Sequence, residues 1–232
     1  MKKIVVLTGA GVSAESGLNT FRDSNGLWEG HDVMEVASPK GFAQNPTLVL
    51  DFYNQRRKQL QKALPNAAHK ALADLERHFD VTVVTQNVDD LHERAGSTNV
   101  MHLHGELLKV RSTGNAQDIR DWRIDLQLGD VCESGHQLRP HIVWFGEMVP
   151  LLEEAAHLVQ KADILIIIGT SMQVYPAASL VHFRANTIPL YFIDPRPNIA
   201  ANDFDRLTII TATAVKGVPH LVQQLITENC SP

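Results

Sequence analysis

The sequence predicts an α/β protein built on a parallel, doubly wound sheet. Most of six short apolar runs are uninterrupted rather than alternating, which is typical of strands that are covered on both faces. Segments with helical patterns lie between these runs, and strands that alternate with helices favour a parallel sheet. A chain of 232 residues has room for one such domain with a small additional lobe.

The expected elements follow in chain order. The strand-like runs are residues 4–8, 81–85, 142–145, 164–168, 190–193 and 208–211. Asn45 followed by Pro46 forms an N-cap and first-turn pair for a helix through residue 61, and Asn66 can cap a helix that extends to residue 79. Gly96 ends the helix expected at 89–95. Further helices are expected at 151–161, 176–184 and 218–229.

Two segments depart from this alternation. Residues 20–43 have no strand pattern and contain three glycines, so we expect a long functional loop. Residues 111–139 are polar and irregular, and we expect them to contribute to a small lobe inserted into the main domain.

Composition and charge limit the range of partners. The formal net charge of -5 does not favour nucleic acid or an anionic membrane as a partner. No apolar run approaches the roughly 20 residues of a membrane span. The apolar run at 4–7 is shorter than the roughly 7–15 residues of a signal-peptide core, and two cysteines cannot form a disulfide framework. We therefore expect a soluble cytoplasmic protein without nucleic-acid or membrane partners.

A glycine-rich turn, LTGAGVSA at residues 7–14, follows the first strand. Gly9, Gly11 and Ala14 satisfy the G-x-G-x-x-G/A pattern, which lets backbone N–H groups approach a pyrophosphate. Packing alone can also explain glycines in such a turn. A dehydrogenase would place an acid about 20 residues further on, whereas the better acid here is Asp194, at the end of a later strand. The sequence thus favours dinucleotide binding without the usual arrangement for hydride transfer.

Polar residues also follow two other expected strands. QNVDDLH at 86–92 follows the strand at 81–85, and GTS at 169–171 follows the strand at 164–168. Ligands bind at the carboxyl ends of strands in open α/β sheets. Asn87 or Asp89 could also cap a helix, and the two roles are compatible. The strand ends therefore outline one cleft, where an amide pair and carboxylates can hold a carboxamide and stabilise positive charge.

Two histidines at i and i+2 occur in MHLHGE at residues 101–106, and they share a face if the segment is extended. Three interpretations compete. The histidines could be metal ligands, although no third ligand stands at an obvious spacing. One could be satisfied and the other exposed. Alternatively, one is a general base, because histidine titrates near neutral pH. His104, which Gly105 follows directly, is the better candidate for a base.

Together these motifs resemble the sirtuin family of NAD-dependent protein deacylases. The resemblance covers most of the chain and is carried in order by GAGVSAESGLNTFR, TQNVDDLHERAG, HLHGE, RPHIVWFGE and GTS. It implies a single catalytic unit over residues 1–232. This unit would combine a large Rossmann-like domain, at about 1–30, 65–110 and 140–232, with a smaller lobe at about 31–64 and 111–139.

The resemblance also implies the reaction and its residues. NAD would be consumed as a co-substrate: the acyl-lysine oxygen attacks the nicotinamide ribose, nicotinamide leaves, and O-acyl-ADP-ribose forms. His104, Asn87 and Asp89 would be catalytic, with His104 as the proton acceptor. The residues expected around NAD are Gly9, Ala10, Gly11, Ser13, Glu15, Thr20, Phe21, Arg22, Trp28, Gln86, Asn87, Val88, Asp89, His104, Gly169, Thr170, Ser171, Asp194 and Ala214.

An acylated lysine in a protein or peptide is the implied partner. The peptide backbone would add a strand along the segment that consists of Val143, Trp144, Phe145, Gly146 and Glu147.

The resemblance extends to the acyl group. Tyr53 and Arg56 share one helix face and match the Tyr-x-x-Arg pair of the sirtuin branch that removes succinyl and malonyl groups. The planar guanidinium suits a carboxylate, and the phenol adds a hydrogen bond. Ala37 matches the small residue that enlarges the acyl pocket of that branch. We therefore expect a preference for acidic acyl groups alongside deacetylation, and we assign Arg57 and Lys58 to a solvated helix face.

The chain departs from the family in its metal ligands. Sirtuins usually hold a structural zinc with two pairs of cysteines, but residues 111–139 contain only Cys132 and His136 as thiolate or imidazole ligands. Because a structural zinc site needs four ligands, we expect no metal. Packing of Trp122, Ile124 and Leu126 would then hold the lobe.

Two other functions remain open at this point. The same cleft could serve an NAD-dependent protein ADP-ribosyltransferase, or the chain could be a non-catalytic sensor of NAD or acyl-lysine. A sensor would not need the base His104. The sequence does not indicate the oligomeric state.

Overall fold

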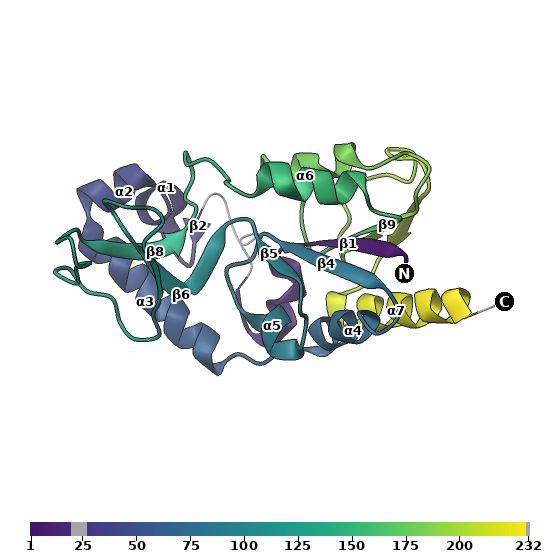
Figure 1. The fold of residues 1–232 in the computed structure, drawn as a ribbon, viewed down its shortest axis with the longest axis horizontal. Helices are drawn as coiled ribbons and strands as arrows, with labels where there is room; N and C mark the ends of the chain where they lie inside the picture. The colour runs from purple at the N-terminus through teal and green to yellow at the C-terminus, as the bar shows by residue number, and fades with distance from the viewer. Residues whose placement is uncertain (20–26, 231–232) are drawn as a thin grey trace.

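The computed structural model describes residues 1–19 and 27–230, and a six-stranded parallel sheet forms its centre (Figure 1). The strand order is β11-β10-β9-β1-β4-β5, so the first strand of the chain lies inside the sheet. The strands are β1 (Lys3–Thr8), β4 (Asp80–Thr85), β5 (Val100–His102), β9 (Ile164–Ile168), β10 (Leu190–Ile193) and β11 (Leu207–Ile210).

Helices cover both faces of this sheet, with α6 on one side and α4 and α7 on the other (Figure 1). Successive residues of β1 point to opposite faces: Ile4 and Val6 enter one hydrophobic core, and Val5 and Leu7 enter the other. The doubly wound parallel sheet is therefore confirmed. The covering helices are α4 (Ala67–Leu75), α6 (Leu152–Gln160), α7 (Ala214–Cys230) and the 3-10 helix η3 (Ala177–Phe183).

A second, antiparallel sheet of three strands lies beside the first, in the order β7-β6-β8. Its apolar residues pack with those of three helices in one core, in which Phe52 and Tyr53 meet Leu107 and Trp144. The elements of this part are α1 (Val33–Val36), α2 (Pro39–Gln44), α3 (Pro46–Lys62), β6 (Gly105–Ser112), β7 (Ile119–Asp121) and β8 (Leu138–Ile142). The remaining elements are η1 (Ala10–Val12), η2 (Ala14–Ser16), β2 (Leu27–Trp28), β3 (His31–Asp32) and α5 (Leu91–Ala95).

The capping signals in the sequence act as expected. The Asn45 side chain accepts from the Leu48 amide at 3.1 Å at the start of α3, and Asn66 accepts from the Ala68 amide at 2.9 Å at the start of α4. Gly96 adopts the left-handed conformation, with φ of 109°, and ends α5. Each of these residues satisfies backbone groups that a helix end leaves unpaired.

Three expected elements were wrong in detail. The strand expected at 142–145 ends at Ile142 in β8, because the next amides bond to loop carbonyls: Val143 donates to His104 O at 2.9 Å and Phe145 to Ala37 O at 2.9 Å. The helix expected at 176–184 is 3-10 rather than α. The loop expected at 20–43 contains β2, β3, α1 and most of α2 in its described part, residues 27–43.

The lobe around Cys132 is packed differently from the expectation. Leu126 is buried beside Cys132 and Trp122 packs on the same cluster, but Ile124 is 69% exposed and cannot contribute to it. Over residues 1–19 and 27–230, no three His, Cys, Asp or Glu side chains gather as a metal site would require.

The assignment of Arg57 to a solvated face was also wrong. Arg57 is 1% exposed, and its guanidinium donates to Asn54 Oδ1 at 2.7 Å and to Leu107 O at 3.3 Å. Lys58 does lie at the surface. No helix in the described part of the chain has the length and apolarity needed to cross a membrane.

Candidate active site

A cavity of about 280 Å³ lies between the carboxyl ends of the parallel strands and the antiparallel sheet. It brings together most of the residues that the sequence singled out. Those lining it are Gly9, Ala10, Gly11, Ser13, Trp28, Ala37, Tyr53, Arg56, Gln86, Asn87, Val88, Asp89, His104, Val143, Trp144, Phe145, Gly146, Glu147, Gly169, Thr170 and Ser171. Thr20, Phe21 and Arg22 lie outside the described residues.

Three expected NAD contacts are not in this lining. Asp194 is buried at the end of β10, where its carboxylate accepts from the Arg196 amide at 2.8 Å. Ala214 is the buried first residue of α7, and Glu15 accepts from the Val215 amide at 3.3 Å. Glu15 therefore contacts the first turn of α7, where Ala214 also lies, rather than the cavity wall.

The glycine turn after β1 packs tightly against the end of β9. A Cβ on Gly11 would lie 2.6 Å from Gly169 Cα, and one on Gly9 would lie 2.7 Å from Thr170 Cβ. Gly169 itself has a φ of 61°, which favours glycine. The packing of the two strand ends therefore requires these glycines, and the turn they form lines the cavity.

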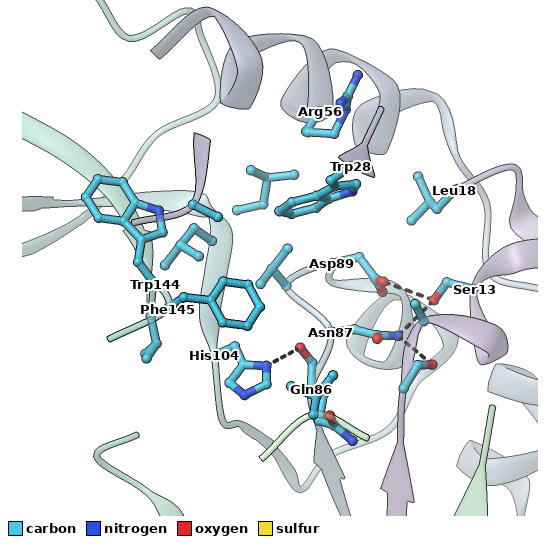
Figure 2. Close-up of a pocket in the computed structure, with 18 of the residues that line it drawn as sticks. Ser13, Leu18, Trp28, Arg56, Gln86, Asn87, Asp89, His104, Trp144 and Phe145 are labelled. Carbon is cyan, nitrogen blue, oxygen red and sulfur yellow. Dashed lines mark hydrogen bonds between the residues drawn. The ribbon is translucent and has the colours of Figure 1, made fainter. Parts of the chain in front are cut away.

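Ser13 joins the polar residues at the base of the cavity (Figure 2). Its hydroxyl donates to Asp89 Oδ2 at 2.9 Å and accepts from Asn87 Nδ2 at 3.3 Å, and the same Asn87 nitrogen lies 3.3 Å from Gly9 O. The Asn87 amide orientation follows from these bonds, since its nitrogen faces two acceptors. Asn87 Oδ1 is consequently left as the acceptor of this side chain.

Asp89 is a buried carboxylate, only 6% exposed. Burial raises its pKa to about 6, against the opposing effect of hydrogen bonds from the Leu91 amide and Ser13. An ionised carboxylate in this buried position lowers the stability of the folded protein. Such a group stabilises a cation that forms beside it.

His104 is held as a neutral base at the cavity wall (Figure 2). Its Nδ1 lies 3.0 Å from Gln86 O, and a carbonyl can only accept, so Nδ1 carries the proton and Nε2 is the basic atom. Burial lowers the pKa of His104 below its ordinary value. The imidazole is therefore ready to accept a proton near neutral pH.

Tyr53 and Arg56 lie in the cavity wall formed by α3. The Tyr53 hydroxyl accepts from Trp144 Nε1 at 2.9 Å. Arg56 Nη1 lies 3.9 Å from Glu29 Oε1. Arg56 Nε and Nη1 are nonetheless buried and have no hydrogen-bond acceptor among the described residues. Glu29 follows the β2 strand, and no sequence motif marked it.

The Glu147 carboxylate accepts hydrogen bonds from two arginines and from the backbone of its own segment. It accepts from Arg139 Nη1 at 2.7 Å, from Arg111 Nη2 at 3.0 Å and from the Trp144 amide at 2.8 Å. The Arg139 guanidinium also lies over the Trp144 ring, 3.3 Å from its centroid. These contacts fix the turn that presents Trp144 and Phe145 to the cavity.

The model of the Sir2 family matches residues 9–176. The chain belongs to this family. It is 57% identical to an NAD-dependent protein deacylase of Helicobacter pylori over 226 residues, which are 97% of this chain and 98% of that protein. An NAD-dependent protein deacylase of Bacteroides thetaiotaomicron is 50% identical and covers 97% of this chain and 99% of its own.

Solved Sir2 structures share the fold. A Sir2 homolog–NAD complex is 40% identical, with a TM-score of 0.88 over 98% of this chain and 91% of that chain. A mutant Sir2 homologue with ADP-ribose is 39% identical, with a TM-score of 0.88 over 98% and 93% of the two chains. A Sir2–p53 peptide–NAD+ complex is 29% identical, with a TM-score of 0.78 over 97% and 92%.

Proposed function

We propose that this Sir2 protein is an NAD-dependent protein-lysine deacylase with a preference for acidic acyl groups, such as succinyl and malonyl. The Sir2 relatives are NAD-dependent protein deacylases, and the site has the base and polar residues that this reaction needs. The observation that carries the acyl preference is Arg56 in the cavity wall, whose Nε and Nη1 are buried and lack an acceptor among the described residues.

The residues at the strand ends fit NAD. Gly9, Ala10 and Gly11 line the cavity, where the close packing of Gly9 and Gly11 on the end of β9 would leave room for a pyrophosphate beside the turn. Asn87 engages Ser13 and Gly9 O through Nδ2, so its Oδ1 would accept from a ribose hydroxyl. NAD would supply a ribose carbon that becomes electrophilic as nicotinamide leaves. The buried Asp89 carboxylate would stabilise the positive charge that develops there, and His104 Nε2 would take the proton of a ribose hydroxyl.

A carboxylate on the acyl chain would accept hydrogen bonds from the Arg56 nitrogens that lack an acceptor among the described residues. A buried donor without a partner costs about 1–3 kcal/mol, and a guanidinium pairs with a carboxylate through two parallel hydrogen bonds. Glu29 at 3.9 Å leaves that geometry unfilled. Burial raises the pKa of the Tyr53 phenol, so its hydroxyl keeps a proton that it can donate to the same carboxylate.

An acylated peptide would lie along residues 143–147. The amides of Val143 and Phe145 already donate to His104 O and Ala37 O. An added peptide strand would therefore bond to the carbonyl oxygens of this segment. We also propose a cytoplasmic location, since two cysteines in 232 residues do not suit an oxidising compartment.

The test uses one peptide sequence with acetyl-, malonyl- or succinyl-lysine, incubated with and without NAD and followed by mass spectrometry. We expect NAD-dependent release of all three groups, O-acyl-ADP-ribose as product, and faster removal of the acidic groups. Arg56→Met should lower kcat/KM for the succinyl peptide by about tenfold or more, the loss of a charged hydrogen bond, and change deacetylation far less.

Lys58→Met is the matched control, because Lys58 lies on the same helix but is exposed. Equal losses for succinyl and acetyl peptides in Arg56→Met would refute the acyl preference. Turnover without NAD, or ADP-ribose attached to the protein, would refute the deacylase assignment.

A further inference from the structure

The two histidines of HLHGE bind successive carbonyls of the turn that follows β4. His104 Nδ1 lies 3.0 Å from Gln86 O, and His102 Nδ1 lies 3.1 Å from Asn87 O. His102 makes a second bond through its other nitrogen, which lies 2.6 Å from Glu93 Oε1 on α5. His102 thus bridges the turn to a helix, whereas His104 faces the cavity.

The two acceptors of His102 determine how many protons it carries. A backbone carbonyl and a carboxylate both accept, and neither can donate to the imidazole. A neutral imidazole has one N–H and satisfies one of them, whereas an imidazolium donates to both. The observed pair of contacts is therefore complete only when His102 is protonated.

The charges around His102 support that state. Glu93 faces it from α5 and Glu106 from β6, and both raise the pKa of His102. Burial opposes them, and the net direction is upward from the ordinary value of 6.5. In return, charged His102 offsets a small part of the rise that burial gives the pKa of Asp89, and it adds to the lowering that burial gives the pKa of His92. The cations on these elements are paired: Lys109 of β6 with Glu106 at 2.7 Å, Arg111 of β6 with Glu147 at 3.0 Å, and Arg94 of α5 with Asp90 at 3.5 Å. Lys109 also helps to lower the pKa of Glu93.

The bond from His102 to the Asn87 carbonyl holds the backbone of a residue whose side chain faces the cavity. Asn87 aims its side chain at Ser13 and Gly9 O, and Asp89 follows two residues later with a bond to Ser13. A shift of the Asn87 backbone would therefore move both groups that face the ribose. Misplacement by about 1 Å near a reacting centre can cost up to about a hundredfold in rate.

We propose that His102 is a positioning residue: as an imidazolium between Asn87 O and Glu93, it holds the turn that carries Asn87 and Asp89 in the geometry for nicotinamide release. This inference rests on the proposed deacylase function. His102 itself does not line the cavity, so it acts through Asn87.

A bell-shaped pH profile follows from the two histidines. His104 must be neutral to act as a base, so activity rises with pH through its lowered pKa. His102 must be charged to hold both acceptors, so activity falls as the pH rises through its raised pKa. The decrease in activity at alkaline pH is therefore caused by His102, which does not line the cavity.

The experiment measures kcat and the KM values for NAD and for the acyl peptide against pH in the full-length wild type, His102→Ala and His102→Asn. Asparagine places an amide nitrogen near the position of Nδ1 and can donate to Asn87 O without titrating. We expect His102→Ala to lose about tenfold or more in kcat with little change in KM for the peptide. His102→Asn should recover most of that loss and lack the alkaline limb.

Two further measurements separate the explanations. His157→Ala removes an exposed histidine on α6 and should leave the profile unchanged. NMR titration of the His102 ring should show a pKa above 6.5 that decreases in Glu93→Gln. A neutral His102 at pH 6.5, or an alkaline limb that persists in His102→Asn, would overturn the inference.

The failure of the proposed function gives a different result. Wild type without NAD-dependent turnover would refute the deacylase function, and the NMR result would still decide the protonation state of His102.

Discussion

The indole Nε1 of Trp144 donates a hydrogen bond of 2.9 Å to the hydroxyl of Tyr53, 91 positions earlier in the chain. An indole N–H cannot accept, so the Tyr53 oxygen is the acceptor and its own proton must point elsewhere. Arg139 stacks on the other partner, Trp144, and is itself paired with Glu147. These contacts hold the Tyr53 hydroxyl in place and leave its proton available to another acceptor.

Replacing Trp144 by phenylalanine should therefore weaken the recognition of acidic acyl groups. Trp144→Phe keeps an aromatic ring but removes the N–H, and about 1 kcal/mol for a neutral hydrogen bond corresponds to a roughly fivefold loss. We expect the ratio of kcat/KM for succinyl over acetyl peptide to decrease by that factor. In a double-mutant cycle with Tyr53→Phe the losses should not add. Additive losses would mean that Trp144 acts independently of Tyr53.

Asp89→Asn should make the protein more stable and less active. The pKa of Asp89 is raised by burial from 3.8 to about 6. The folded state therefore binds this proton more tightly than the unfolded state does. The contribution of the group to stability is present below about pH 4 and is lost as the pH rises through about 6. Asparagine keeps an acceptor for the Leu91 amide without the buried charge.

At pH 7.5 we expect a gain on the order of 1–3 kcal/mol in the free energy of unfolding, or several degrees in Tm. Deacylation should meanwhile decrease by at least an order of magnitude, because a neutral amide stabilises developing positive charge poorly. Thermal unfolding between pH 4 and pH 7.5 checks the sign: the advantage of the variant must grow with pH. A constant difference would show that the pKa of Asp89 is the same in the folded and unfolded states, and would contradict the raised value.

Gly11→Ala should unfold the junction between the ends of β1 and β9. The added Cβ would lie 2.6 Å from Gly169 Cα and 2.8 Å from Gly169 O, both backbone atoms that cannot rotate away. Overpacking of this kind costs about 1–3 kcal/mol or more. Gly17→Ala is the control, since its Cβ meets nothing within 4 Å and only its φ of 85° is strained. Urea unfolding should show the larger loss for Gly11→Ala.

The parallel sheet could be predicted because its signals are local. The strand at Ile164–Ile168 is five consecutive buried aliphatic residues, and Asn45 and Asn66 cap helices through bonds to amides two or three residues away. The cavity was predictable for a related reason. Strands that run in parallel bring their carboxyl ends, and the polar residues that follow them, to one edge of the sheet.

Long-range contacts determine the parts that sequence patterns missed. Arg57 carries the same local pattern as the exposed Lys58, but it is buried and donates to Asn54 and to Leu107 O, the latter 50 positions away. Val143 and Phe145 have strand-like side chains, but their amides bond to loop carbonyls instead of a strand. The sequence did not predict the bond between His102 and Glu93, because Glu93 lies nine positions earlier on a separate helix.

The most consequential of these distant contacts joins α3 to the loop beside Cys132. Asn54 Nδ2 donates to Leu126 O at 3.0 Å, and the Leu126 amide donates back to Asn54 Oδ1 at 2.8 Å, 72 positions away. Arg57 Nη1 donates to the same Asn54 oxygen at 2.7 Å. One buried side chain thereby holds the main chain of the loop in both directions, in the lobe where sirtuins usually bind zinc.

Asn54→Ala should consequently destabilise this lobe by about 2–4 kcal/mol, because the Leu126 backbone groups and Arg57 Nη1 lose their buried partner. Lys58→Ala on the same helix removes an exposed ion pair with Asp125 and should cost less than about 1 kcal/mol. Urea unfolding measures both, and a metal chelator should leave the wild-type curve unchanged. A large loss of stability on chelation, with Asn54→Ala close to wild type, would show that a bound metal, rather than this side chain, holds the loop.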